Sequence, residues 1–150
     1  MSKMVKEVEN KLNEAIALAV EKATQSGDLP EAEMPKFIIE KPADMKNGDF
    51  SANIAIAGAR AYHQAPRMIA EAIVKNFSLD GGYIDRCEIA GPGFINFYLS
   101  DKYYSDVLKD IVSSGDNYGR SDYGEGKKML VEFVSANPTG PMHIGNARGG

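Results

Sequence analysis

Cysteine and histidine are scarce in this chain, which has one cysteine, Cys87, and two histidines among 150 residues. A single cysteine excludes a disulfide within the chain, and so few ligands make a poor set for a structural metal ion. We therefore expect neither a disulfide scaffold nor a metal site. Cys87 and His63 are interpreted as ordinary structural residues.

Long apolar runs are also missing, since none approaches the roughly 18 residues of a membrane-spanning helix. The N-terminal stretch "MSKMVKEVEN" lacks the apolar core of a signal peptide. A hydrophobic share of 43% and a charged share of 25% are typical of a soluble globular protein. We therefore expect a cytoplasmic protein without a membrane partner. A monomer is favoured, but the sequence does not determine the oligomeric state.

An excess of positive charge is absent as well, because the formal net charge is -4. This charge argues against a nucleic-acid binder that works by bulk positive potential, but it leaves room for one that reads shape and stacks bases beside a local basic strip. Candidates for such a strip are Arg60, Arg67, Lys75 and Arg86. The same four residues fit solvated helix faces equally well, and the sequence leaves both interpretations open.

Apolar residues recur every three or four positions between residues 5 and 23, which predicts an amphipathic helix. A second helix is expected over residues 52–62, with Ser51 as its candidate N-cap. Pro66 suits the first turn of a third helix, "PRMIAEAIVKNF".

A fourth helix is expected to start near Ser100 and Asp101 and to end near Gly115. Its apolar residues fall at helical spacing, and they are Tyr104, Val107, Leu108 and Ile111.

Strand-like runs occur at "KFIIE" and on both sides of Gly91-Pro92-Gly93, where an antiparallel pair is expected. In the second run of this pair, a period of two divides the side chains into two faces. One set is wholly apolar and is expected to face the core: Ile95, Phe97 and Leu99. The other set would present two aromatic rings and an amide to solvent: Phe94, Asn96 and Tyr98.

The last part of the chain changes character after the glycine-rich, polar stretch 113–127, which is the best candidate linker. "MLVEFV" then has the apolar, β-branched character of a strand buried on both faces of a parallel sheet. A loop and a helix start at Met142 or His143 follow, and α/β sheets bind ligands at such strand-to-helix crossings. His143 would donate to phosphate oxygens, and Gly145 would let a flat base approach the backbone. The alternative is a proline-rich loop whose histidine simply caps a helix.

The stretch "VEFVSANPTGPMHIGNARGG" resembles the HIGH-signature region of class I aminoacyl-tRNA synthetases, and specifically that of arginyl-tRNA synthetases. "NGDFSANIAI", "PRMIAEAIVKNF", "EIAGPGFINFYLS" and "NYGRSDYGEGKKMLVEF" resemble other parts of the same family. The resemblance implies an α+β additional domain over residues 1–112, with helices on a small, mainly antiparallel sheet. It further implies a linker over 113–127 and the first strand and turn of a Rossmann-like catalytic domain over 128–150, where the chain would stop just inside that domain.

The resemblance also implies roles for single residues. His143 would hold the ATP phosphates while the arginine carboxylate attacks the α-phosphorus, and Gly145 and Asn146 would complete the ATP contact. Asn146 stands where the name-giving motif has a second histidine; an amide donates a hydrogen bond but carries no positive charge. The residues implied for arginine binding are Glu132, Ser135 and Asn137. For Glu132, an ion pair at a strand edge is the alternative.

The family's tRNA contact matches "GPGFINF", where Phe94 would stack on an unstacked base of the D-loop and Asn96 would hydrogen-bond its edge. The alternative is that a helix covers Phe94 and Tyr98.

The implied parent activity is that of an arginine-tRNA ligase, with tRNA, arginine and ATP as partners and Mg²⁺ accompanying ATP. The 150-residue chain is expected to need no cofactor of its own and to be inactive alone, with a "MLVEFVSANPTG" segment that is mobile or packs against a neighbouring molecule. Two other functions remain open, a stand-alone RNA-binding module and another nucleotide-activating enzyme of the same superfamily.

Overall fold

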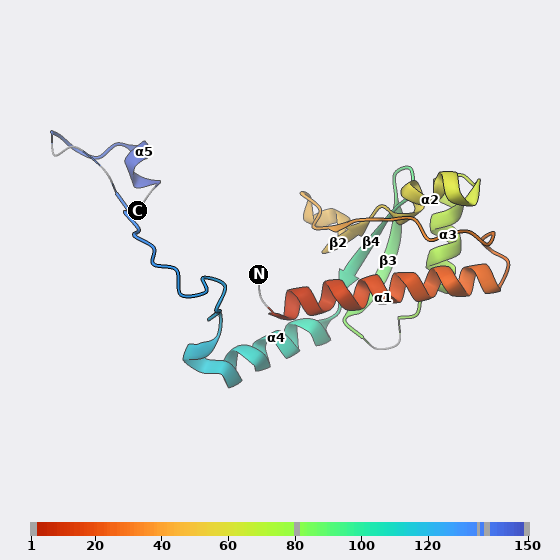
Figure 1. The fold of residues 1–150 in the computed structure, drawn as a ribbon, viewed down its shortest axis with the longest axis horizontal. Helices are drawn as coiled ribbons and strands as arrows, with labels where there is room; N and C mark the ends of the chain where they lie inside the picture. Colours follow the sequence, from red (N-terminus) through yellow and green to blue (C-terminus); the bar gives the residue numbers. More distant parts are fainter. Residues whose placement is uncertain (1–2, 80–81, 135, 137–138, 149–150) are drawn as a thin grey trace. The chain divides into compact units, whose positions relative to one another are not determined.

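A computed structural model describes residues 3–79, 82–134, 136 and 139–148. The chain divides into two compact units, residues 1–118 and residues 119–150 (Figure 1). The N-terminal unit contains all of the described strands and every described helix except the short α5 (Ile144–Ala147). None of the helices within the described ranges has the length and apolar character needed to cross a membrane.

The sheet of the N-terminal unit has four strands, β1 (Ile39–Glu40), β2 (Phe50–Ala52), β3 (Ile84–Ala90) and β4 (Phe94–Leu99). Their spatial order is β1-β2-β4-β3, and every neighbouring pair is antiparallel. β4 therefore lies between β2 and β3 and is bonded on both edges. The predicted pairing across Gly91-Pro92-Gly93 is confirmed, because Ala90 faces Phe94 across this loop.

Three helices supply the other half of the core: α1 (Lys3–Gln25), α2 (Ile54–Tyr62) and α3 (Pro66–Asn76). α3 packs against both α1 and α2, and it also meets β3 and β4 (Figure 1). One buried cluster joins these helices to β2 and β4, and its largest fully buried members are Tyr62, Phe97, Leu12, Ile16, Leu29, Ile54, Ile69, Ile73, Ile95 and Val8. Each large aliphatic side chain buried in this way stabilises the fold by about 1.5–3 kcal/mol. The α+β fold expected from the sequence is confirmed.

The predicted cap of α2 is wrong. Ser51 lies in β2, and the N-cap of α2 is Asn53, whose Oδ1 instead accepts a hydrogen bond of 2.9 Å from the backbone N–H of Ile38. The short helix η1 (Met45–Asn47) precedes β2. A serine at the start of a helical pattern is ambiguous, because strand pairing with a distant segment takes precedence over local capping.

Helix α4 (Asp101–Ser114) follows β4 and leads into η2 (Gly115–Asn117). It touches the core chiefly through Tyr103, whose ring lies edge-on to Tyr83 with centroids 5.6 Å apart, and through half-buried Val107. The other apolar residues of its predicted stripe are exposed: Tyr104 at 48%, Leu108 at 62% and Ile111 at 37%. The helix is confirmed, but Tyr104, Leu108 and Ile111 are not buried by the N-terminal unit.

The predicted strand "MLVEFV" is not formed in the C-terminal unit. Residues 128–134 contain no strand, and their apolar side chains are exposed, from 38% for Val134 to 100% for Leu130. A strand that is buried on both faces needs neighbouring strands and covering helices. The described part of this unit supplies no second strand, so the segment remains extended and uncovered. The Rossmann-like start expected from the sequence is therefore not observed.

A carboxylate fixes the loop after α1 to the end of α3. Asp28 accepts hydrogen bonds from Lys75 Nζ at 2.8 Å, Asn76 Nδ2 at 2.9 Å and Ser26 Oγ at 2.8 Å. These bonds favour the ionised form and lower the pKa of the Asp28 carboxyl to about 2, with the bond from Lys75 as the largest cause, followed by those from Asn76 and Ser26. The contacts connect segments that lie nearly fifty positions apart in the sequence.

Replacement of this carboxylate should destabilise the N-terminal unit in a pH-dependent way. The folded-state pKa of about 2 lies below the ordinary value of 3.8, so the contribution is complete above about pH 4 and is lost as the pH falls through about 2. Asp28→Asn should therefore lower the melting temperature by a few degrees at pH 7, and the gap to the wild type should close between pH 4 and pH 2. Thermal melts followed by circular dichroism measure this. Asp116→Asn on exposed η2 is the control, and an equal loss in both variants would contradict the assignment.

Candidate functional site

The face of the sheet that turns away from the helices carries a row of polar and aromatic side chains on β4. Ile95 and Phe97 are fully buried in the core. Successive strand residues point to opposite faces, so Phe94, Asn96 and Tyr98 lie on the other side, which we call the outer face. The predicted division of β4 into two faces is confirmed for these residues.

The prediction that Asn96 lies open to solvent is wrong. Asn96 is only 4% exposed, and its Oδ1 accepts a hydrogen bond of 2.8 Å from Ser51 Oγ. In the register of the sheet, Asn96 lies between Ser51 of β2 and Glu88 of β3. A short amide on a central strand is shielded by the side chains of both neighbouring strands, which the sequence of β4 alone does not reveal. Its contact with a base remains a prediction.

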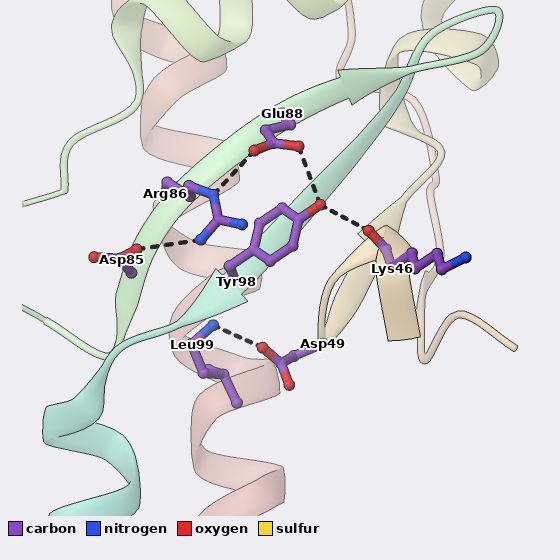
Figure 2. A network of polar contacts seen from close by, with 7 residues as sticks. All are labelled: Lys46, Asp49, Asp85, Arg86, Glu88, Tyr98 and Leu99. Atoms are coloured by element: carbon purple, nitrogen blue, oxygen red, sulfur yellow. Dashed lines mark hydrogen bonds and ion pairs between the residues drawn. The ribbon is translucent and has the colours of Figure 1, made fainter. Parts of the chain in front are cut away.

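Tyr98 is the centre of a polar cluster on the outer face (Figure 2). The guanidinium carbon of Arg86 lies 3.7 Å from the centroid of the Tyr98 ring, and Arg86 Nε donates to Glu88 Oε1 at 2.9 Å. The Tyr98 hydroxyl lies 3.0 Å from both Glu88 Oε2 and the backbone oxygen of Lys46, and its single proton serves one of them at a time. Hydrogen bonds from Arg86 and then Tyr98 lower the pKa of Glu88.

The two aromatic rings of the outer face therefore differ in their availability. Arg86 covers one face of the Tyr98 ring, and both oxygens of Glu88 are engaged with this pair. Phe94 is half-buried and has no aromatic or cationic partner in the described part of the chain. Phe94 is thus the more available of the two rings for stacking, with part of its surface covered within the unit.

The segment before β2 is fixed to the end of β4. Leu99 N–H donates to Asp49 Oδ2 at 2.8 Å, and Asp49 N–H donates to the backbone oxygen of Phe97 at 2.9 Å (Figure 2). Gly48 makes this approach possible, because it has a φ of +87° and a Cβ there would lie 2.7 Å from the Phe97 oxygen. Apart from the glycine itself, no residue pattern indicates this contact.

The basic residues proposed as a phosphate-facing strip are largely paired with carboxylates. Arg86 contacts Glu88 and Asp85, Lys75 contacts Asp28 at 2.8 Å, and Arg67 contacts Glu71 at 3.4 Å. Arg60 is the member of the set with no ion pair in the residues that the structure describes. Paired cations attract phosphate weakly, and only Arg86 of this set belongs to a strand of the sheet, the others lying on α2 and α3.

In the C-terminal unit, His143 caps the short helix α5. Its Nδ1 accepts a hydrogen bond of 3.1 Å from Gly145 N–H, and its own N–H donates to Asn146 Oδ1 at 3.3 Å. Nδ1 of His143 therefore caps α5, as in the alternative interpretation that the sequence left open. Because Nδ1 accepts, the proton of the neutral imidazole lies on Nε2, which remains a donor for another group.

Gly145 gives room for this cap, since a Cβ there would lie 2.9 Å from Cε1 of His143. The space beside Gly145, where a flat base was expected to approach, is thus occupied by the imidazole of His143. Beside it is an open hollow of about 520 Å³, whose lining includes Thr139, Gly140, His143 and Asn146. Of the three residues predicted to contact ATP, His143 and Asn146 thus line this hollow, and Gly145 stands between them in the sequence.

Of the three residues predicted to bind arginine, the structure describes Glu132 alone. Glu132 is exposed and makes no ion pair in the described part of the chain, so it is not the strand-edge pair of the alternative interpretation. Ser135 and Asn137 lie outside the described residues.

The residues interpreted as structural occupy ordinary places. His63 is exposed and ends α2 with a φ of 49°. Cys87 is half-buried in β3, where burial, with a smaller effect of Glu88, raises the pKa of the thiol and disfavours the reactive thiolate. No group of three or more metal-ligating side chains is found among the described residues.

The fold has a counterpart among solved structures. An arginyl-tRNA synthetase from Plasmodium falciparum superimposes with a TM-score of 0.56 over 69% of this chain and 18% of that chain, at 21% identity. This likeness shows that the two proteins share a fold over the matched portion.

Residues 7–99 match the family described as arginyl tRNA synthetase N terminal domain, and the chain belongs to that family. Similar proteins named arginine-tRNA ligase include one from Acetivibrio thermocellus, 49% identical over 150 residues, and one from Listeria monocytogenes, 49% identical over 146 residues. The matches cover 100% and 97% of this chain but 27% and 26% of those proteins. The chain thus spans about a quarter of the length of these relatives.

A side chain at Gly48 should loosen the contact between the segment before β2 and β4. Gly48→Ala combines an unfavourable φ with a clash against a backbone oxygen, so it should lower the free energy of unfolding by about 1–3 kcal/mol. Urea denaturation measures the change. Gly82→Ala is the matched control, because its Cβ would meet no atom within 4 Å. Equal stability of the two variants would show that the Gly48 contact is dispensable.

Proposed function

We propose that this chain is the N-terminal portion of an arginine-tRNA ligase, the enzyme that activates arginine with ATP and transfers it to the 3′ end of tRNA. The observation behind the proposal is the family match over residues 7–99. Relatives named arginine-tRNA ligase that match along the whole chain, at 49% and 45% identity, support it. The reaction belongs to the complete ligase, of which this chain corresponds to about a quarter.

The proposal divides the work between the two parts of the chain. Residues 1–112 form the tRNA-reading domain, residues 113–127 connect, and residues 128–150 begin the catalytic domain. The division of the structure after Tyr118 falls within the proposed connecting segment and supports this arrangement.

The tRNA contact is assigned to the outer face, where Phe94 stacks on an unpaired base of the D-loop and Asn96 hydrogen-bonds the edge of that base. Phe94 has a partly exposed ring beside a polar row, which is the combination that single-stranded RNA requires. The pairing of Arg86 with Glu88 and Asp85 on this face supports a contact based on stacking.

The ATP contact is assigned to His143, Gly145 and Asn146. The free Nε2–H of His143 is a donor for phosphate oxygens while the arginine carboxylate attacks the α-phosphorus and pyrophosphate leaves. Asn146 uses its Oδ1 for the cap, which leaves its amide nitrogen as a neutral donor. Mg²⁺ enters with ATP as part of the substrate.

The arginine contact is assigned to Glu132, Ser135 and Asn137. The unpaired carboxylate of Glu132 is suited to the ammonium or guanidinium group of the substrate, because charge-assisted hydrogen bonds are strong. We place the complete ligase in the cytoplasm, where charged tRNA is used, and as a monomer. A module that only binds RNA has no use for the His143 segment, so the ligase is favoured over it.

Loss of the Phe94 ring should weaken tRNA binding while leaving the fold intact. Stacking of one base contributes about 1–3 kcal/mol, so Phe94→Ala should weaken binding of an arginine tRNA transcript at least fivefold. Fluorescence titration at low salt measures this, since phosphate contacts fade as salt rises. Tyr123→Ala, which removes a ring that is 93% exposed in the C-terminal unit, is the control. Equal affinities of wild type and Phe94→Ala would remove the outer face from the tRNA contact.

The 150-residue chain alone should not form arginyl-adenylate, because its predicted catalytic strand is uncovered and has no sheet to join. Arginine-dependent exchange of pyrophosphate into ATP measures the reaction. The complete Acetivibrio thermocellus relative, assayed in parallel, is the positive control. Exchange by the short chain above background would contradict the assignment of activity to the complete ligase.

A further inference from the structure

Two polar residues stand out from the core of the N-terminal unit because they are buried without being charged. Ser51 is 8% exposed and Asn96 is 4% exposed, and they are the buried polar residues recorded for the described part of the chain. They face each other in the register of β2 and β4 and share a hydrogen bond of 2.8 Å. Buried polar groups are normally satisfied, so each remaining donor or acceptor of such a pair calls for an explanation.

The hydrogen bond fixes which way the Asn96 amide points. Its Oδ1 accepts from the Ser51 hydroxyl, so the oxygen is directed toward β2 and the Nδ2 group is directed away from it. No hydrogen bond to Nδ2 is found among the described residues. Among the described residues, the Tyr62 hydroxyl is the fully buried side-chain polar atom that lacks a hydrogen-bond partner. Asn96 Nδ2 does not belong to that class. Nδ2 is therefore an unpaired donor with access to solvent.

The neighbour on the other side does not take this donor. Glu88 of β3 is in register with Asn96, but the described structure has no hydrogen bond between them; Glu88 Oε1 accepts from Arg86 and Oε2 lies 3.0 Å from the Tyr98 hydroxyl (Figure 2). The cluster around Tyr98 thus holds the Glu88 carboxylate toward one end of β4. The amide is left between the Phe94 ring and this occupied cluster.

We propose that Ser51 is a positioning residue that sets the polarity of Asn96, so that the outer face presents a hydrogen-bond donor beside the Phe94 ring. Phe94 and Asn96 are two residues apart on one face of a strand, roughly 7 Å along it. That spacing lets a base stack on the ring while its edge meets the amide. The base must then offer an acceptor, a carbonyl oxygen or an unprotonated ring nitrogen, at that edge.

This inference rests on the proposed tRNA contact and adds the polarity of the contact and the residue that sets it. Its test compares two transcripts of arginine tRNA, one unaltered and one with the D-loop bases replaced. The quantity measured is the dissociation constant for the altered transcript divided by that for the unaltered one. A general loss of stability does not change this ratio. Titrations of the 150-residue chain at low salt supply both constants, and melting temperatures are recorded for every variant.

Three variants separate positioning from packing. Ser51→Ala removes the donor that orients the amide, so the ratio should fall about three- to tenfold, the range expected for one neutral hydrogen bond. Ser51→Thr keeps the hydroxyl and should preserve the ratio. Asn96→Asp can still accept from Ser51 but has no donor to offer, so it should lose at least as much discrimination as Ser51→Ala. Ser113→Ala, at an exposed serine of α4, is the matched control.

The outcomes distinguish this inference from the proposed function. If Phe94→Ala weakens binding while Ser51→Ala and Asn96→Asp keep the wild-type ratio, the polarity assignment is overturned and the tRNA contact stands. A lower melting temperature of Ser51→Ala with an unchanged ratio likewise gives Ser51 a packing role only and overturns it. If Phe94→Ala binds as the wild type does, or the chain does not bind the transcript, the proposed contact fails and the inference with it.

Discussion

The central position of β4 is the constraint on which the rest of the N-terminal unit depends. Because β4 pairs with β2 on one edge and β3 on the other, its two faces are fixed by the pleat. Ile95 and Phe97 on one face anchor the helices, and Phe94, Asn96 and Tyr98 on the other form the candidate site. A shift of the register by one residue would exchange these faces, so the same pairing that builds the core also builds the outer face.

Local patterns predicted much of this arrangement. The helical period of α1, the proline at the start of α3 and the two extended runs around residues 91–93 are all visible in short windows of sequence, and the structure has each element. The alternation along β4 also separated inner from outer residues, because a period of two is a property of the strand itself.

The remaining features depend on contacts between distant segments. Ser51 precedes a helical pattern, so the local sequence favours a cap. Its actual role as the partner of Asn96 depends on pairing across 45 positions, which the local sequence does not show. Arg86 and Tyr98 belong to different strands, so their stacking follows from register and not from spacing. The segment 128–134 has the composition of a buried strand, but composition does not supply the neighbouring strands that would bury it.

The outer face combines an acidic protein with a proposed RNA contact, and the ion pairs explain how these agree. Arg86, which covers the Tyr98 ring on this face, has two carboxylate partners, so its charge is less available to attract phosphate without regard to sequence. Attraction of that kind is common to all nucleic acids, whereas stacking and hydrogen bonding depend on an accessible base. Such a face gives up affinity for RNA in general and keeps the part of the interaction that distinguishes one loop from another.

The two units also differ in what they need during synthesis. The N-terminal unit buries its own core, so it has the contacts required to fold as soon as residues 1–118 have left the ribosome. The apolar segment 128–134 has no such partner at that moment, and it combines β-branched residues with few charges. Until a covering partner is present, this segment remains the part of the chain most open to association with other chains.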